Sequence, residues 1–215
     1  THVQHIKDNT KYYGYAPYVR EMNIWLKYVD NVTVVAPIEN IKLDAIHLDY
    51  NHKNLKFKEV QNFNTTSFLN SLQTFFKVPA ILWTIFCVMQ KADHIHLRCP
   101  GNMGLLGCMV QVLFPKIPKT AKYAGNWDPN AKQPFTYKIQ KWILNNTFLT
   151  KNMKVLVYGE WEGSSKNIKP FFTATYSEVK KEAILPRSVK GKINFVFVGT
   201  LSIGKMPLYA IQLVE

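Results

Sequence analysis

The sequence predicts an α/β fold in which a mainly parallel sheet is flanked by helices. Short β-prone runs alternate with stretches of helical hydrophobic periodicity along most of the 215 residues, which is the pattern of parallel sheets. The composition agrees, because 47% of the residues are hydrophobic and 19% are charged, as in a globular protein with a sizeable core. The stretch 92–107, ADHIHLRCPGNMGLLG, shows the pattern most clearly, since a strand, a glycine turn and a helix follow one another directly.

The stretch 92–107 also indicates where a site would lie. Its run 94–97 predicts a buried strand, and the spacing of apolar residues over 103–113 predicts the helix that follows the turn. Open parallel sheets bind ligands outside the carboxyl ends of their strands, against helix amino termini whose free N–H groups attract anions. Three polar residues lie on or beside this edge: His96, Arg98 and Asn102.

The amino-terminal part of the chain predicts two further strands and a helix. Residues 1–4 look like the end of a strand that begins upstream of this sequence, and we expect a polar loop from there to Gly14. The spacing of apolar residues after Pro17 predicts a helix. The β-branched run 32–36, which a proline ends, and the run 55–60 predict strands.

Residues 68–89 are the most hydrophobic part of the chain. The longest run within them, 78–89, is about half of the ~20 residues that a bilayer span needs, and Pro79 interrupts it. We therefore expect a buried or membrane-facing helix here and not a transmembrane one.

The second half of the chain continues the alternation and then changes character. Strands are expected at 120–124 and 153–158, a helix around 139–143 and a β-prone run at 171–175, with a turn-rich loop at 125–134. A basic, polar stretch at 180–192 predicts a linker. After it, the run INFVFV at 193–198 predicts a buried strand, and Pro207 suits the first turn of a helix.

The charge balance points to an anionic partner. Lys and Arg number 27 against 14 Asp and Glu, a net charge of +13, which suits nucleic acid, an anionic membrane face or a phosphate-bearing substrate. The basic residues are spread along the chain, and the sequence has no RNA-binding aromatic signature and no zinc finger, so nucleic acid is the least favoured. Three cysteines without metal-like spacing indicate a reducing compartment, hence the cytoplasm.

Two segments together resemble the family-4 glycosyltransferases. Residues 93–104, DHIHLRCPGNMG, are similar to that family's motif of Asp, two hydrophobic residues and His-x-His, followed by a proline and a helix. Residues 197–205, FVGTLSIGK, are similar to the F-V-G-R-L-x-x-x-K opening of its donor-binding domain. Gly14 and Tyr15 occupy the place of its amino-terminal glycine loop. The resemblance covers nearly the whole chain.

The resemblance implies transfer of a sugar from a nucleotide-sugar to an acceptor, with retention of anomeric configuration. Such enzymes hold the donor diphosphate with an arginine and a lysine, because fixed cations must already face the leaving group as it gains charge. Lys205 matches the family lysine, whereas Thr200 stands at the position of the family arginine. His96 matches the first histidine of the motif, and Arg98 stands where much of the family has a second histidine near the reacting carbon.

From this resemblance we expect Arg98 and His96 to be catalytic, with Arg98 able to hold a phosphate or carboxylate through its planar guanidinium. In the loop 125–134, an exposed tryptophan can stack on a sugar. No metal or cofactor is expected, since the sequence has no Asp-x-Asp motif and the nucleotide-sugar is the substrate. The residues expected to bind donor or acceptor are Gly14, Tyr15, Asn102, Asn126, Trp127, Thr200 and Lys205.

Several of these residues also have a purely structural interpretation. His96 can be a core histidine bonded at a strand end, and Asn102 can cap the helix that follows it. Trp127 can hold its own loop against the core, and Gly14 can serve only to form a turn. Both interpretations stay open on sequence grounds.

The resemblance divides the chain into an acceptor-binding Rossmann-like domain of the GT-B fold, residues 1–186, and the start of a truncated donor-binding domain, residues 187–215. We do not expect this chain to turn over alone. The expected partners are a nucleotide-sugar donor, a cell-envelope glycan or lipid-linked acceptor, and an anionic membrane surface on the cytoplasmic side. Two other classes remain open. One is a non-catalytic sugar- or nucleotide-binding α/β module, which Thr200 favours. The other is a Rossmann-type epimerase or reductase, against which the absence of a GxGxxG fingerprint argues.

Overall fold

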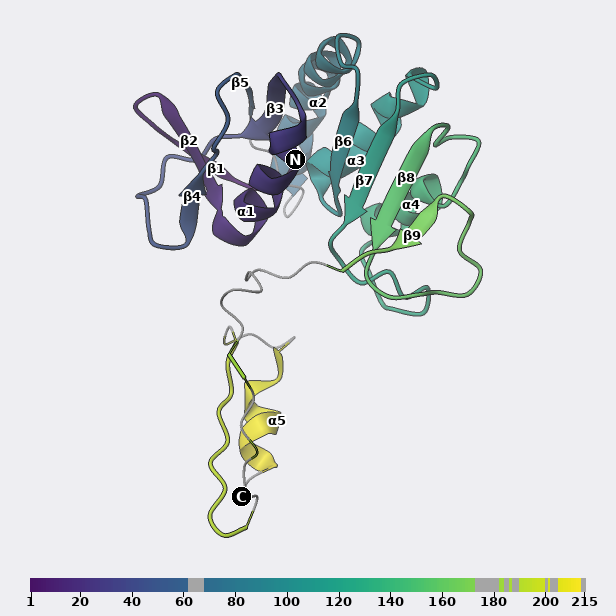
Figure 1. The fold of residues 1–215 in the computed structure, drawn as a ribbon. Helices are drawn as coiled ribbons and strands as arrows, with labels where there is room; N and C mark the ends of the chain where they lie inside the picture. The colour runs from purple at the N-terminus through teal and green to yellow at the C-terminus, as the bar shows by residue number, and fades with distance from the viewer. Residues whose placement is uncertain are drawn as a thin grey trace. The chain divides into compact units, whose positions relative to one another are not determined.

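The computed structural model describes most of the chain, and its contacts divide it into two compact units, Thr1–Thr175 and Tyr176–Glu215 (Figure 1). For residues 68–76 it describes the backbone alone. The described residues are 1–61, 68–172, 182–183, 186, 190–199, 201 and 205–213.

The first unit contains nearly all of the regular structure. Strands and helices alternate along it, as the sequence predicts. Its elements are β1 (His5–Asp8), β2 (Lys11–Tyr15), α1 (Ala16–Trp25), η1 (Leu26–Tyr28), β3 (Val32–Pro37), β4 (His47–Asp49), β5 (Leu55–Val60), α2 (Phe68–Met89), β6 (Ile95–Cys99), α3 (Asn102–Val110), η2 (Gln111–Leu113), β7 (Lys119–Tyr123), α4 (Phe135–Leu144), β8 (Met153–Val157) and β9 (Ile168–Pro170).

Parallel pairing dominates the arrangement of these strands. One sheet has the order β6-β7-β8-β9 with every pair parallel, and β3 pairs with β5 in the same sense. A smaller sheet, β1-β2-β4, is antiparallel. Figure 1 shows α3 and α4 lying behind the four-stranded sheet. The chain is therefore a mixed α/β protein with parallel sheets flanked by helices, compatible with a Rossmann-like fold.

Strand β6 and helix α3 form the centre of this arrangement. Alternate residues of β6 are buried against α3, where a Cβ added to Gly107 would lie 2.9 Å from the Leu97 side chain. A Cβ on Gly104 would lie 2.8 Å from the carbonyl oxygen of Arg98. The two glycines thus let α3 lie directly on one face of the strand. The intervening residues of β6, His96 and Arg98, lie on the other face, toward α1.

The sequence missed the antiparallel sheet. Where a polar loop was expected, β1 and β2 form a hairpin whose turn contains Asn9 with a φ of 52°. Asparagine tolerates this left-handed conformation. The strand end expected at residues 1–4 is not a strand, and the pairing begins at His5.

The strand predicted at 193–198 is a second error. This run lies in the second unit without strand structure, and its apolar side chains are exposed, Val198 at 88%. A strand requires a neighbour that completes its hydrogen-bond ladder, and the described residues of this unit contain only the helix α5 (Pro207–Gln212). Near the end of the first unit, the β-prone run at 171–175 follows β9; its residues 173–175 lie outside the described part of the chain.

Candidate functional site

The carboxyl ends of β6 and β7 carry a cluster of charged side chains under helix α1. Arg98 of β6 lies directly beside Lys122 of β7 in the parallel register. Glu21 of α1 forms ion pairs with both side chains. Its Oε2 lies 3.3 Å from the Arg98 guanidinium, and its Oε1 lies 2.7 Å from Lys122 Nζ. The Arg98 guanidinium also lies 5.4 Å from the centre of the Tyr18 ring.

This cluster is largely shielded from water. The side chain of Arg98 is 15% exposed, that of Glu21 12% and that of Lys122 2%. Removing one partner of such a buried group leaves an uncompensated charge, which costs about 3–5 kcal/mol. The cluster therefore fastens α1 to the sheet, and the guanidinium that the sequence assigns to an anion already engages a carboxylate of the protein.

His96 lies on the same face of β6 as Arg98, two residues earlier in the strand. Its Nδ1 lies 2.8 Å from Thr120 Oγ1, and its ring centre lies 4.9 Å from that of Trp25 on α1. Burial, reinforced by the charges of His94, Arg98 and Lys122, lowers the pKa of His96 to about 3. At neutral pH this imidazole is uncharged, so it can hydrogen-bond a ligand without carrying a positive charge.

The other expected site residues of the amino-terminal edge have distinct environments. Gly14 is buried, and an added Cβ would lie 3.1 Å from Val19 and 3.2 Å from the His5 ring. The next residue, Tyr15, is 49% exposed and precedes α1. Asn102 is the first residue of α3, and the capping position before it belongs to Gly101. The interpretation of Asn102 as the N-cap of this helix is therefore wrong by one residue.

Asn126 and Trp127 lie in the loop between β7 and α4. Asn126 shapes this loop, because its Oδ1 accepts a hydrogen bond of 2.9 Å from the backbone N–H of Asp128. Trp127 is only 5% exposed and lies edge-on to Tyr123, with ring centres 5.0 Å apart. Lys141 of α4 places its ammonium 5.7 Å from the centre of the indole. Trp127 thus both packs the loop against the core and borders the pocket described next.

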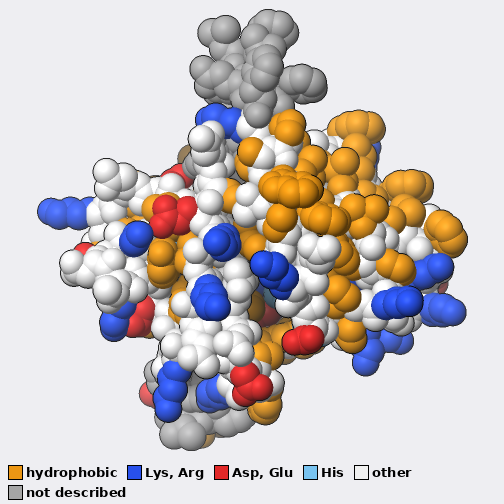
Figure 2. Space-filling view, turned by 90° about the horizontal axis from the view of Figure 1, so that it is seen from above, with side chains coloured by type: hydrophobic (Ala, Val, Ile, Leu, Met, Phe, Trp, Pro, Cys, Tyr) orange, Lys and Arg blue, Asp and Glu red, His pale blue; other side chains and the backbone are white. Residues whose placement is uncertain are grey.

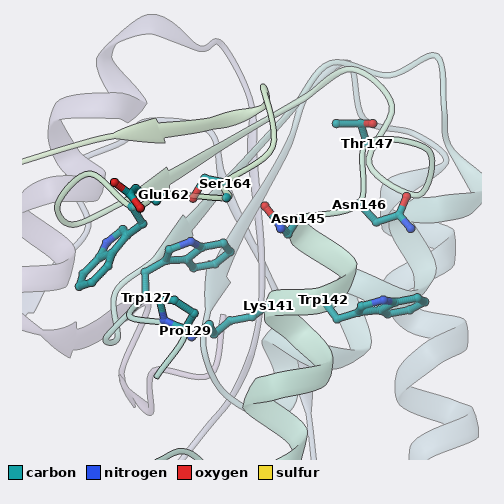
Figure 3. A pocket seen from close by; sticks show the side chains of 11 residues that line it. Trp127, Pro129, Lys141, Trp142, Asn145, Asn146, Thr147, Glu162 and Ser164 are labelled. Carbon is teal, nitrogen blue, oxygen red and sulfur yellow. The ribbon is translucent and has the colours of Figure 1, made fainter. Parts of the chain in front are cut away.

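A cavity of about 520 Å³ opens between this loop, the end of α4 and the segment that follows β8. Figure 3 shows side chains of Trp127, Lys141, Asn145 and Ser164 around it, with Glu162 at one side. Its lining comprises Trp127, Pro129, Lys141, Trp142, Asn145, Asn146, Thr147, Trp161, Glu162, Gly163 and Ser164. Of these, the sequence predictions named Trp127 alone.

The missed residues carry a signal that the sequence does contain. The loop after β7 reads Gly-Asn-Trp-Asp at 125–128, and the loop after β8 reads Gly-Glu-Trp-Glu at 159–162. The same order of glycine, tryptophan and carboxylate thus follows two adjacent parallel strands. A comparison of the two loops would have added Trp161 and Glu162 to the candidates.

Two expected donor-binding residues belong to the second unit. Thr200 lies outside the described residues, and Lys205 is exposed beside the start of α5. Among the residues that the structure describes, there is no group of three or more His, Cys, Asp or Glu side chains placed to hold a metal ion. Searches against models of known protein families and against curated proteins find no match to this chain.

Proposed function

We propose that this chain is part of a retaining glycosyltransferase that moves a sugar from a nucleotide-sugar donor to a cell-envelope glycan or a lipid-linked acceptor without a metal ion. The observation that carries the proposal is the position of the segment 93–104, which resembles the family-4 motif. It coincides with β6, the following turn and the start of α3. The carboxyl end of a parallel strand beside a helix amino terminus is where such folds bind ligands.

The charged cluster at this edge suits a phosphate-bearing substrate. A guanidinium has five N–H donors, and Glu21 takes the one contact to Arg98 Nη1. The remaining donors of Arg98 can meet the oxygens of an anion placed outside the strand ends. His96 stays neutral beside it and can accept or donate a hydrogen bond to a sugar hydroxyl. In the family that this chain resembles, a lysine at the position of Lys205 supplies a cation to the donor diphosphate.

The test is a panel of nucleotide-sugars offered to the full-length protein, with binding and turnover measured separately. One donor is expected to bind and be turned over, and Lys205→Ala is expected to lose that donor. Arg98→Lys keeps a cation beside Glu21 but removes the planar fork, so it should weaken the donor or acceptor contact while preserving the fold. Arg20→Ala, an exposed arginine of α1, is the matched control. Absence of any donor binding would leave a non-catalytic sugar- or nucleotide-binding module as the better proposal.

We further propose that the enzyme works on the cytoplasmic face of an anionic membrane as a peripheral protein. None of the helices in the described part of the chain has the length and apolar character needed to cross a bilayer. Support for surface binding comes from α2, α3 and α4 together with η2 and the segment that follows α4. Five large apolar side chains there are at least half exposed: Trp83, Met109, Leu113, Trp142 and Phe148.

Ring contacts link some of the apolar side chains on this surface, and a lysine lies beside another. Trp83 stacks on Phe86 with ring centres 5.7 Å apart, and Phe86 meets Phe114 at 5.4 Å. The ammonium of Lys151 lies 5.0 Å from the Phe148 ring. Figure 2 shows hydrophobic side chains gathered over one side of the molecule, with Lys or Arg side chains along the margin. Aromatic rings with lysines around them suit an anionic lipid headgroup layer.

Vesicle co-sedimentation tests this docking. Trp142→Ser combined with Phe148→Ser should abolish binding to vesicles that contain anionic lipid at low salt, while Tyr28→Ser, which removes a side chain 84% exposed in η1, should leave it unchanged. Equal vesicle binding by the unmodified protein, the double variant and Tyr28→Ser would rule out this surface as the membrane-binding one.

A further inference from the structure

The paired loops after β7 and β8 give the cavity beside α4 two tryptophans in equivalent positions. Each tryptophan comes two residues after a glycine and one residue before a carboxylate, at 125–128 and at 159–162. Because β7 and β8 are adjacent and parallel, their loops emerge at neighbouring points. Both indoles border the same cavity. The repeated sequence therefore places two tryptophans at one site.

Both rings are held rigidly before any ligand arrives. Trp161 donates its indole N–H to the carbonyl of Tyr158 at 2.8 Å. Its ring lies so close to Gly159 that an added Cβ would be 3.3 Å from Nε1, and the φ of +80° at this glycine further disfavours a side chain. Trp127 is fixed by Tyr123 on one side and by Lys141. Rigid aromatic rings lose little conformational entropy on binding.

The polar groups of the cavity suit hydroxyl groups better than phosphates. Asn145 turns its Oδ1 to the N–H and hydroxyl of Ser165, both at 2.9 Å, so its amide nitrogen remains a donor. Glu162 is exposed at the rim and offers an acceptor. The cation in the lining, Lys141, already donates to the carbonyl oxygen of Asp128 at 2.8 Å. Aromatic faces with a few amide and carboxylate groups around them match the apolar C–H faces and the hydroxyl rim of a sugar ring.

We propose that this cavity is a carbohydrate subsite that binds one or two neutral sugar rings of a glycan, with a ring stacked on Trp161 over a floor formed by Trp127. Its volume of about 520 Å³ lies in the range of small-molecule sites. That the bound glycan is the acceptor rests on the proposed function; that the cavity binds carbohydrate does not.

The test uses saturation-transfer NMR and titration with neutral disaccharides of glucose, galactose, mannose and N-acetylglucosamine, on the full-length protein without donor. At least one disaccharide is expected to bind. Trp161→Ala should weaken it about tenfold, which corresponds to about 1.4 kcal/mol, whereas Trp161→Phe, which keeps a ring, should recover much of the loss. Glu162→Gln changes an exposed residue and should weaken binding about threefold without a change in fold.

Trp83→Ala is the matched control, because this tryptophan is 67% exposed on α2 and does not line the cavity. It should bind the disaccharide as the unmodified protein does. Binding by no disaccharide, or equal binding by Trp161→Ala and Trp83→Ala, would overturn the subsite. Donor binding measured on the same samples separates the two proposals. Glycan binding without any donor binding would contradict the transferase proposal and support the subsite. Donor turnover that does not change when Trp161 or Glu162 is substituted would support the transferase and contradict the subsite as its acceptor site.

Discussion

The two halves of the first unit, residues 1–61 and residues 68–172, differ in both charge and core. The amino-terminal half has 8 Lys and Arg against 7 Asp and Glu, whereas the second half has 13 against 4, namely Asp93, Asp128, Glu160 and Glu162. The basic excess of the unit therefore comes from the half that contains the apolar outer surface of α2–α4. The second half also contains the large core cluster, with 18 buried hydrophobic residues, against four in the cluster of the first half.

This difference indicates that the amino-terminal half depends on the second half for its position. Its small cluster cannot supply much hydrophobic stabilisation alone. Val35 and Val60 pack instead against the large cluster, and the Trp25 ring lies on His96. Glu21 gives the connection its charged component, since it joins α1 to two strands of the other sheet. Substitutions at the contacts between the halves therefore test whether the amino-terminal half depends on the second half.

Glu21→Gln should have the largest effect. The amide fills the same space but leaves Arg98 and Lys122 without the carboxylate that faces them, so we expect the free energy of unfolding to fall by about 3–5 kcal/mol. Urea denaturation measures this loss. Asp49→Asn is the matched control because it breaks the exposed pair with Lys11, a change worth at most about 1 kcal/mol. Equal losses in the two variants would show that the buried cluster does not join the halves.

Acidification should have the next largest effect, acting on both halves. Burial lowers the pKa of His96 to about 3 and that of His5 to about 4, below the value of about 6.5 in an unfolded chain. The unfolded state therefore binds more protons below pH 6.5, and stability is lost as the pH falls from there. Between pH 7 and pH 5 each histidine should cost about 2 kcal/mol.

Urea midpoints at the two pH values measure this loss, and hydrogen exchange assigns it to a half. His96→Gln should flatten the pH dependence by about 2 kcal/mol, leaving the contribution of His5, which contacts the Tyr50 hydroxyl at 2.7 Å in the small cluster. An unchanged slope in His96→Gln would mean that this imidazole is not buried in its neutral form.

The sequence predicted the second half well; in the first half it predicted α1, β3 and β5 but missed the antiparallel sheet, for a physical reason. The expected strands at 94–97, 120–124 and 153–158 recur as β6, β7 and β8 with shifts of one or two residues at their ends, and α2 spans the hydrophobic stretch 68–89. Helix α4 begins four residues before the helix expected around 139–143. Elements in this half are buried in one large core, so their hydrophobic periodicity is strong. The short strands β1, β2 and β4 have few buried residues. Their pairing depends on turn geometry and on contacts distant in sequence, which local patterns do not record.

The candidate site divides in the same way. Chain order placed His96 and Arg98 at a strand end. The structure confirms that position for Arg98, the fourth residue of β6, whereas His96 is the second residue of this five-residue strand. Chain order could not reveal that Glu21, 77 residues away, would meet Arg98, because that contact is made by the packing of α1. The repeat of Trp127 and Trp161 was visible in the sequence, but its meaning depends on β7 and β8 being neighbours, which only the topology shows.

The smallest of the expected effects concerns how closely α3 lies on β6 within the second half. Gly104→Ala places a Cβ 2.8 Å from the Arg98 carbonyl oxygen and 2.9 Å from Gln140 Oε1, whereas Gly107→Ala places one 2.9 Å from the end of the Leu97 side chain. A backbone carbonyl cannot move without shifting the strand, but a leucine methyl group can rotate away. Overpacking costs about 1–3 kcal/mol, and alanine in place of glycine returns up to about 1 kcal/mol in a helix.

We therefore expect Gly104→Ala to lower the free energy of unfolding by about 1–2 kcal/mol and Gly107→Ala to leave it nearly unchanged. Urea denaturation of the two variants beside the unmodified protein measures both values. Because Arg98 lies on the strand that Gly104→Ala would push, this variant should also weaken the hold of Glu21 on the sheet. A double variant with Glu21→Gln should then lose less stability than the sum of the two single losses, whereas full additivity would show that the spacing of α3 and the charged cluster are independent.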